Sequence, residues 1–202
     1  MLFPTKIYTA FRYCLILEVT PMKLVTAVVA IVVALSASAF AQTSPEIDKA
    51  LSAAPAQMKD GATVIKWKSD FTYDTLKKGT NRLVCYDRPI QAGDQPFSVE
   101  CTSIANLDRV AVSLKTEAST TPATRRAAFE ELEKAGKWPK PEMGSIFYNF
   151  SGPSQAQARS HATICVPGAT TATLGLPENG NQGGAWIMNA GSSAAHLMMP
   201  GH

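Results

Sequence analysis

Hydrophobic and polar residues alternate in several short stretches of the chain, which is the pattern of strands that bury one face. In the first half of the chain, this alternation covers residues 65–68. In the last third it covers residues 146–150 and 162–166, and two shorter stretches follow at 185–188 and 196–199. We expect a strand at each of these places.

Residues 71–76 and 82–87 are two further strand-like stretches, and the sequence KKGTN connects them. Glycine readily adopts the backbone conformations that tight turns require, and Gly79 lies in this connection. We therefore expect the two stretches to pair as a hairpin that turns at Gly79.

Three other stretches have apolar residues three and four positions apart, which is the spacing of amphipathic helices. They cover residues 44–54, 104–114 and 122–135. Ser44 can cap the first of these helices, and Gly136 can end the last. Strands followed by helices and then by more strands indicate an α+β fold in a single domain, with a mainly antiparallel sheet and two or three helices.

The longest apolar run lies near the start of the chain, where residues 24–35 contain no charge. Lys23 precedes this run and an Ala-x-Ala pattern at Ala39 and Ala41 follows it, which is the order of a secretory signal peptide. The run is shorter than the roughly 20 apolar residues of a membrane span. We predict that residues 1–41 are a leader, that the protein is exported to the periplasm or secreted, and that no membrane span remains after cleavage.

The predicted mature chain, residues 42–202, is expected to form the single globular domain. Residues 1–21 precede the signal, either because translation starts at Met22 or because they form a long n-region that is removed with the signal. Of the 202 residues, 46% are hydrophobic and 17% are charged, which excludes a disordered acidic tail or a collagen-like repeat. The formal net charge of +3 is too small to indicate a nucleic-acid partner, which would require a clustered basic surface.

Three cysteines follow the predicted leader: Cys85, Cys101 and Cys165. Export makes a disulfide plausible. Cys85 and Cys101 flank a loop rich in proline and glycine, and closing a loop of about 15 residues stabilises a fold by about 3 kcal/mol. We predict that these two cysteines pair. Cys165 lies in an apolar run and is therefore predicted to be a buried hydrophobic residue. The alternative is a reactive thiol, but no neighbour in the sequence would lower the pKa of this thiol.

Candidate metal ligands gather near the C-terminus. The chain has no nucleophile elbow, no H-E-x-x-H helix and no paired C-x-x-C motif. Thioether and imidazole groups suit copper, and such groups occur at Met188, His196, Met198, Met199 and His202. On a strand, His196 and Met198 would point to the same face, with Cα atoms about 6.6 Å apart. One hypothesis is therefore a copper site at His196 and Met198, with His161 as a third ligand; the alternative is that these side chains fill the core, with no cofactor bound.

A second hypothesis is a hydrolase-like enzyme in which His161 and His196 act as acid and base. Histidine is the usual group for proton transfer near neutral pH. No carboxylate or nucleophile lies at an indicative spacing from either residue, so the sequence favours a protein that is not an enzyme.

Several segments together resemble a group of uncharacterised exported bacterial proteins, in which a short leader precedes W-x…L-x-x-G-x-N…C, a second cysteine and a final W-I-M/W-A-G…H-L-M-x-P. The matching residues here are Trp67, Leu76, Gly79, Asn81, Cys85, Cys101, Trp186, Ile187, Met188, Gly191, His196, Leu197, Met198 and Pro200. The resemblance covers most of the mature chain. It implies export, a bacterial origin and the Cys85–Cys101 pairing, and it transfers no catalytic role.

The sequence thus favours an exported protein that acts by binding or as an accessory module. Copper handling and hydrolysis are the two alternatives. The sequence identifies neither the ligand nor a protein partner.

Overall fold

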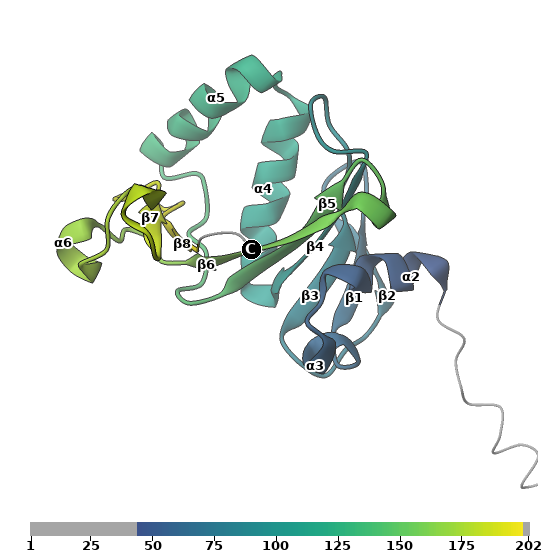
Figure 1. The fold of residues 1–202 in the computed structure, drawn as a ribbon. Helices are drawn as coiled ribbons and strands as arrows, with labels where there is room; N and C mark the ends of the chain where they lie inside the picture. Colours follow the sequence, from purple (N-terminus) through teal and green to yellow (C-terminus); the bar gives the residue numbers. More distant parts are fainter. Residues whose placement is uncertain (1–43, 200–202) are drawn as a thin grey trace, which may run out of the picture. The chain divides into compact units, whose positions relative to one another are not determined.

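Eight strands of the chain form one sheet in the computed structural model, which describes residues 44–199 (Figure 1). The order across the sheet is β2-β1-β3-β4-β5-β6-β8-β7. The strands are β1 (Thr63–Trp67), β2 (Tyr73–Lys77), β3 (Leu83–Asp87), β4 (Phe97–Ser103), β5 (Ile146–Gly152), β6 (Arg159–Cys165), β7 (Trp186–Met188) and β8 (His196–Met198). Every neighbouring pair is antiparallel except β1 and β3. The predicted α+β fold with a mainly antiparallel sheet is therefore confirmed, while the predicted leader, residues 1–41, lies outside the described residues.

The expected hairpin between β2 and β3 is wrong, because β1 lies between these two strands. β1 pairs antiparallel with β2 and parallel with β3. Four of the five residues of β3 are buried, which requires an interior place in the sheet, whereas β2 is almost wholly exposed and forms an edge. Gly79 is needed for a different reason from the one expected: a Cβ there would lie 2.3 Å from the carbonyl oxygen of Gly61.

The helices are α2 (Pro45–Ala50), α3 (Ala56–Lys59), α4 (Leu107–Ala118), α5 (Pro122–Lys134) and α6 (Thr171–Leu174). Single 3-10 turns lie at η1 (Leu51–Ala53), η2 (Ile104–Asn106), η3 (Gln155–Gln157) and η4 (Gly180–Gln182). Ser44 caps α2 as predicted, since its hydroxyl oxygen accepts a hydrogen bond from the Ile47 amide at 3.4 Å. Gly136, with φ +64°, follows α5 as predicted. The three expected helices thus correspond to α2 with η1, η2 with α4, and α5.

Two apolar clusters hold helices against opposite faces of the sheet, because successive strand residues point to opposite sides. On one face, Ala50 and Leu51 pack on Val64, Leu83 and the Cys85–Cys101 pair. On the other face, three residues of α4 pack on β1 and β3; this cluster contains Leu107, Val110, Leu114, Ile65, Trp67, Val84 and Tyr86. Figure 1 shows α4 beside β4 and β5, with α5 farther from the sheet. α4 therefore covers one face of the sheet, and α2 with η1 covers the opposite face.

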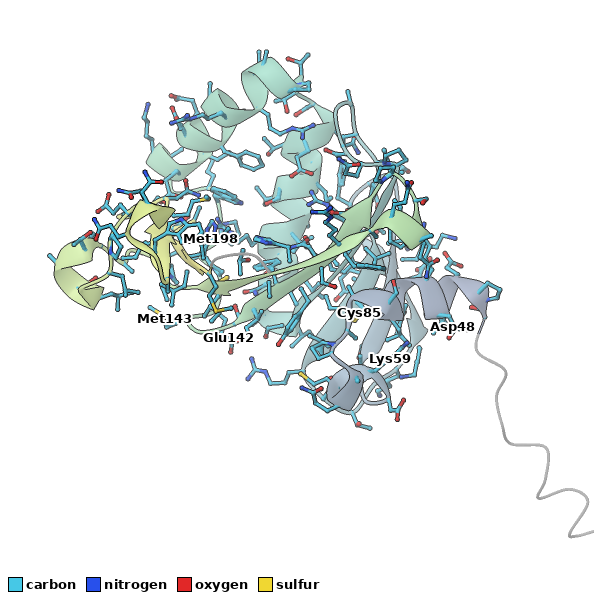
Figure 2. The ribbon with its side chains drawn as sticks, viewed as in Figure 1. Asp48, Lys59, Cys85, Glu142, Met143 and Met198 are labelled. Atoms are coloured by element: carbon cyan, nitrogen blue, oxygen red, sulfur yellow. A yellow bond between two sulfur atoms is a disulfide. The ribbon has the colours of Figure 1, made fainter. Side chains whose placement is uncertain are left out.

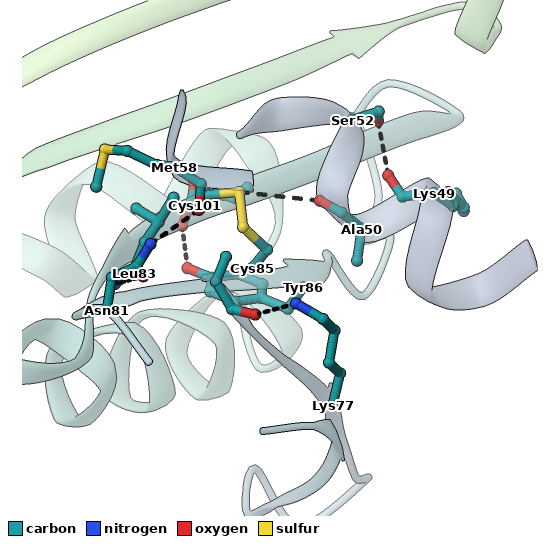
Figure 3. Close-up of a disulfide and its surroundings, with 12 residues drawn as sticks. Lys49, Ala50, Ser52, Met58, Lys77, Asn81, Leu83, Cys85, Tyr86 and Cys101 are labelled. Atoms are coloured by element: carbon teal, nitrogen blue, oxygen red, sulfur yellow. Dashed lines mark hydrogen bonds between the residues drawn. A yellow bond between two sulfur atoms is a disulfide. The ribbon is translucent and has the colours of Figure 1, made fainter. Parts of the chain in front are cut away.

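The predicted disulfide joins Cys85 of β3 to Cys101 of β4, which lie directly opposite each other (Figure 3). Their Cα atoms are 4.0 Å apart, and both residues are fully buried under η1. The Sγ atom of Cys101 lies 3.8 Å from the carbonyl oxygen of Ala50. Cys165 is a buried free cysteine, as predicted. Among the described residues, no helix has the length and apolar character needed to cross a membrane.

Candidate functional site

A cavity of about 350 Å³ lies between α4 and strands β4 to β6, and we call it the Arg109 cavity. Its wall on the helix side comes from Arg109, Ser113 and Glu117. These residues are four positions apart, so the helical period places them in one row on α4. The loops before β5 and before β8 close the remaining sides, where Trp138 and Ala194 line the cavity.

The floor of the cavity is a set of polar residues from adjacent strands. Glu100 of β4 lies directly opposite Asn149 of β5, and Cys165 of β6 lies directly opposite His196 of β8. Residues opposite each other in a sheet point to the same face, which here is the face that α4 covers. The strand register therefore brings together side chains that are far apart in the sequence.

Arg109 is the most unusual residue of this cavity, because it is a buried cation, 6% exposed, with no carboxylate within 4 Å among residues 44–199. Within residues 44–199, its guanidinium forms no ion pair closer than 4 Å; its Nη1 donates to the carbonyl of Pro139 at 2.6 Å and to the hydroxyl of Ser193 at 3.2 Å. The guanidinium also stacks on the Trp138 ring, 3.6 Å from its centroid. Burial lowers the pKa of Arg109 to about 10, so the group is still charged at neutral pH. Burying a charge without a counter-ion costs several kcal/mol, which makes this position a candidate binding site.

The nearest acidic group reaches Arg109 only through an intermediate residue. Glu133 of α5 accepts hydrogen bonds from the amide and the hydroxyl of Ser193, the same residue that accepts from Arg109. These contacts hold the guanidinium in place from one side. In the described part of the chain, its Nε and Nη2 atoms have no hydrogen-bond partner, and neither atom is sealed from solvent.

The opposite end of the cavity holds a cluster of buried charges. Arg88 donates to Glu117 at 2.5 Å, and its Nη1 lies 3.6 Å from Glu100. The hydroxyl of Tyr86 donates to the other oxygen of Glu100. Burial raises the pKa of Glu100, and burial with the nearby Glu100 charge raises the pKa of Tyr86, so the phenol remains the donor. Burial alone would lower the pKa of Arg88, but the charges of Glu100 and Glu117 outweigh it and hold that pKa above its ordinary value.

Further polar side chains along the cavity have hydrogen-bonding groups that are not used within residues 44–199. Among residues 44–199, the side chains of Asn149 and Thr163 form no hydrogen bond. His196 has its Nδ1 atom 2.8 Å from the carbonyl of Ala194, so Nδ1 carries the proton that is donated. In the neutral ring, Nε2 is then a free acceptor. Apolar walls with a few convergent polar groups are typical of small-molecule sites.

Cys165 and His196 are the residue types of cysteine nucleophilic catalysis, and they lie side by side here. Catalysis of that kind uses the thiolate. Burial raises the pKa of the Cys165 thiol above its ordinary value, which keeps it neutral. The pair contributes polar lining to the cavity, with the Cys165 thiol in its neutral form.

The residues singled out from the sequence are distributed over separate places. His196 lines the Arg109 cavity, whereas His161 is exposed and lines a separate hollow beside Pro55, so the structure does not bring the two histidines together. Met198 follows His196 by two positions on β8 and does not line the cavity; Figure 2 labels it at the end of the sheet distant from Cys85. Among the described residues, no three His, Cys, Asp or Glu side chains are placed to hold a metal ion. His202 lies outside the described residues, and copper binding stays a prediction.

Arg109, Glu117, Arg88 and Glu100 were not predicted from the sequence. A signal was present for three of them. Arg109 and Glu117 interrupt the apolar face of α4, next to Val110 and Leu114, and a charge on an apolar helix face is worth noting. Glu100 lies in the strongly buried strand β4, where a carboxylate needs a partner.

A second, larger groove of about 660 Å³ runs between α5 and the loop before β8. It shares Trp138, Asn189 and Ala194 with the Arg109 cavity. None of the residues of α5 is buried, and Phe129 of this helix stacks on Trp138, with ring centroids 4.6 Å apart. Trp138 therefore separates the groove from the cavity.

Compared with known proteins, the chain matches no family model, and neither a curated protein nor a solved structure matches it significantly.

Proposed function

We propose that this is an exported binding protein and that the Arg109 cavity holds a small organic anion. The observation that carries the proposal is the burial of Arg109 without a carboxylate partner among residues 44–199, on the wall of a 350 Å³ cavity. A carboxylate ligand would supply the missing counter-charge and could accept from the free Nε and Nη2 atoms together.

The surroundings of Arg109 favour binding over catalysis. Ser193 and Trp138 hold the guanidinium, so little side-chain freedom would be lost when a ligand binds. The neutral Cys165 thiol and the distance between the two histidines provide no acid, base or nucleophile set. Leu114 and Phe147 give the same cavity an apolar wall for the body of a ligand.

Export is proposed on the leader pattern of residues 1–41 and on the buried Cys85–Cys101 disulfide. A disulfide at the centre of a sheet is consistent with an oxidising compartment.

Titration calorimetry tests the binding proposal with the sodium salts of acetate, butyrate, pentanoate and phosphate, at one ionic strength set with chloride. We expect saturable binding of one carboxylate per chain. Arg109→Gln should weaken it at least about tenfold, or roughly 1.4 kcal/mol. Arg109→Lys keeps the charge and should retain part of the affinity.

The matched control is Arg126→Gln on α5, because the Arg126 side chain is 91% exposed and, in the described part of the chain, its ion pair is with the exposed Glu130. This variant should bind like the wild type. The proposal is overturned if no salt binds saturably, or if Arg126→Gln weakens binding as much as Arg109→Gln does.

A further inference from the structure

The two ends of the Arg109 cavity carry opposite charge. Arg109 lies near the start of α4 and has donors without partners, as described above. Glu117 lies near the end of the same helix and faces Glu100 across Arg88. This acidic end holds two carboxylates for one guanidinium, so its formal charge is negative when both are ionised.

The acidic end also has acceptor oxygens left over. The two carboxylates have four oxygens. Within the described residues, two of these accept hydrogen bonds, one from Tyr86 and one from Arg88, and a third lies 3.6 Å from Arg88. The Glu117 Oε1 atom has no partner there. The Glu100 and Glu117 side chains are only 8% and 12% exposed, so this spare capacity faces the cavity rather than bulk solvent.

We infer that the ligand is dipolar: a molecule with a carboxylate at one end, bound by Arg109, and an ammonium group at the other, bound by Glu117 and Glu100. This inference rests on the proposed function, because it needs the carboxylate end to occupy the Arg109 site. A simple anion would pair with Arg109 and leave the Glu117 Oε1 atom without a donor among the described residues. A simple cation would leave Arg109 without an anionic partner there.

The helix sets the approximate length of such a ligand. Arg109 and Glu117 are eight residues apart, and a rise of 1.5 Å per residue separates their Cα atoms by about 12 Å along α4. The two charged ends of the cavity are thus set about two turns of α4 apart. An α-amino acid carries both charged groups on one carbon, so we choose a longer probe, an ω-amino acid of five carbons.

The test compares pentanoate, 5-aminopentanoate, pentylamine and glycine by titration calorimetry at one ionic strength and neutral pH. We expect 5-aminopentanoate to bind at least about tenfold more tightly than pentanoate, and glycine and pentylamine to bind more weakly than both. In Glu117→Gln, the advantage of 5-aminopentanoate over pentanoate should fall to less than about twofold.

A circular dichroism spectrum and a urea midpoint like those of the wild type would report that the Glu117→Gln variant is folded. If that variant binds neither molecule, the comparison of the four probes on the wild type decides the question. Equal affinities for pentanoate and 5-aminopentanoate would overturn the dipolar ligand and leave the anion site standing. Failure of both to bind would overturn the proposed function itself.

Discussion

Glu100 is a buried carboxylate beside Arg88 and the Tyr86 hydroxyl, and its protonation links the cavity to pH. Burial raises the pKa of Glu100 above its ordinary value of 4.5, and the nearby Glu117 adds to the shift, while Arg88 and the Tyr86 hydroxyl act against it. The folded protein therefore binds this proton more tightly than the unfolded chain does. It follows that the contribution of Glu100 to stability is greatest at low pH and falls as pH rises through the interval above 4.5.

Glu100→Gln should remove this pH dependence, because glutamine does not titrate. The free energy of unfolding of the wild type minus that of Glu100→Gln is expected to decrease as pH rises above 4.5. Urea unfolding of both proteins at several pH values measures this difference. Glu130→Gln on the exposed face of α5 is the control and should show no such trend. A difference that grows with pH would show that the folded pKa is lowered instead.

At the residue scale, the sequence predicted part of the site. It singled out His196, which lines the cavity, and it predicted that Cys165 is buried. It did not single out Arg109, because the groups that surround its guanidinium include Ser193, which lies 84 positions away in the sequence. Whether a charge is compensated is a property of the folded arrangement.

At the scale of elements, the sequence pattern predicted seven of the eight strands of the described residues, missed β4 (Phe97–Ser103) and paired two strands wrongly. Alternation of apolar residues shows that a stretch has one buried face, but it does not name the neighbouring strand. β1 separates β2 from β3, and the connection from β2 to β3 therefore passes over the backbone at residues 61–63. Gly79 makes this close approach possible.

Gly79→Ala should lower the free energy of unfolding by more than about 2 kcal/mol. The added Cβ would meet backbone atoms, 2.3 Å from the Gly61 oxygen and 2.5 Å from the Ala62 carbonyl carbon. Gly136→Ala is the matched control: its φ of +64° is unfavourable for alanine, but nothing lies within 4 Å, so we expect a cost of about 1 kcal/mol. Urea unfolding compares the two. A cost for Gly79→Ala no greater than that for Gly136→Ala would contradict the β2-β1-β3 arrangement.

The disulfide connects β3 and β4, which the sheet already pairs. It is expected to stabilise the protein by lowering the conformational entropy of the unfolded chain. Cys85 and Cys101 are separated by 16 positions, and closing a loop of this size contributes about 3 kcal/mol. The double variant Cys85→Ala, Cys101→Ala should lose about that much stability in urea.

Intact mass after alkylation in denaturant, without reductant, tests the pairing itself. In the predicted mature chain, residues 42–202, which lacks Cys14, one modified thiol is expected, from Cys165, and three modified thiols would contradict the disulfide. A Cys165→Ala variant should then show none.

At the scale of the whole molecule, the α+β class followed from the sequence because the order of strand and helix patterns determines which layers can form. The cavity did not, since it requires α4, four strands and two loops to be placed together. Its walls come from residues between Arg88 and His196, which spans more than half of the described chain. The central prediction is that this assembled cavity binds an anion at Arg109.

Nuclear magnetic resonance of the arginine side chains tests that claim most directly. The Nε–H resonances of Arg109, Arg88 and Arg126 can be followed while sodium pentanoate is added at fixed ionic strength, each assigned by its arginine-to-lysine variant. The account predicts a saturable shift of the Arg109 resonance, with the exposed Arg126 resonance unchanged. An Arg109 resonance that does not move while pentanoate is added, or one that moves no more than that of Arg126, would contradict it.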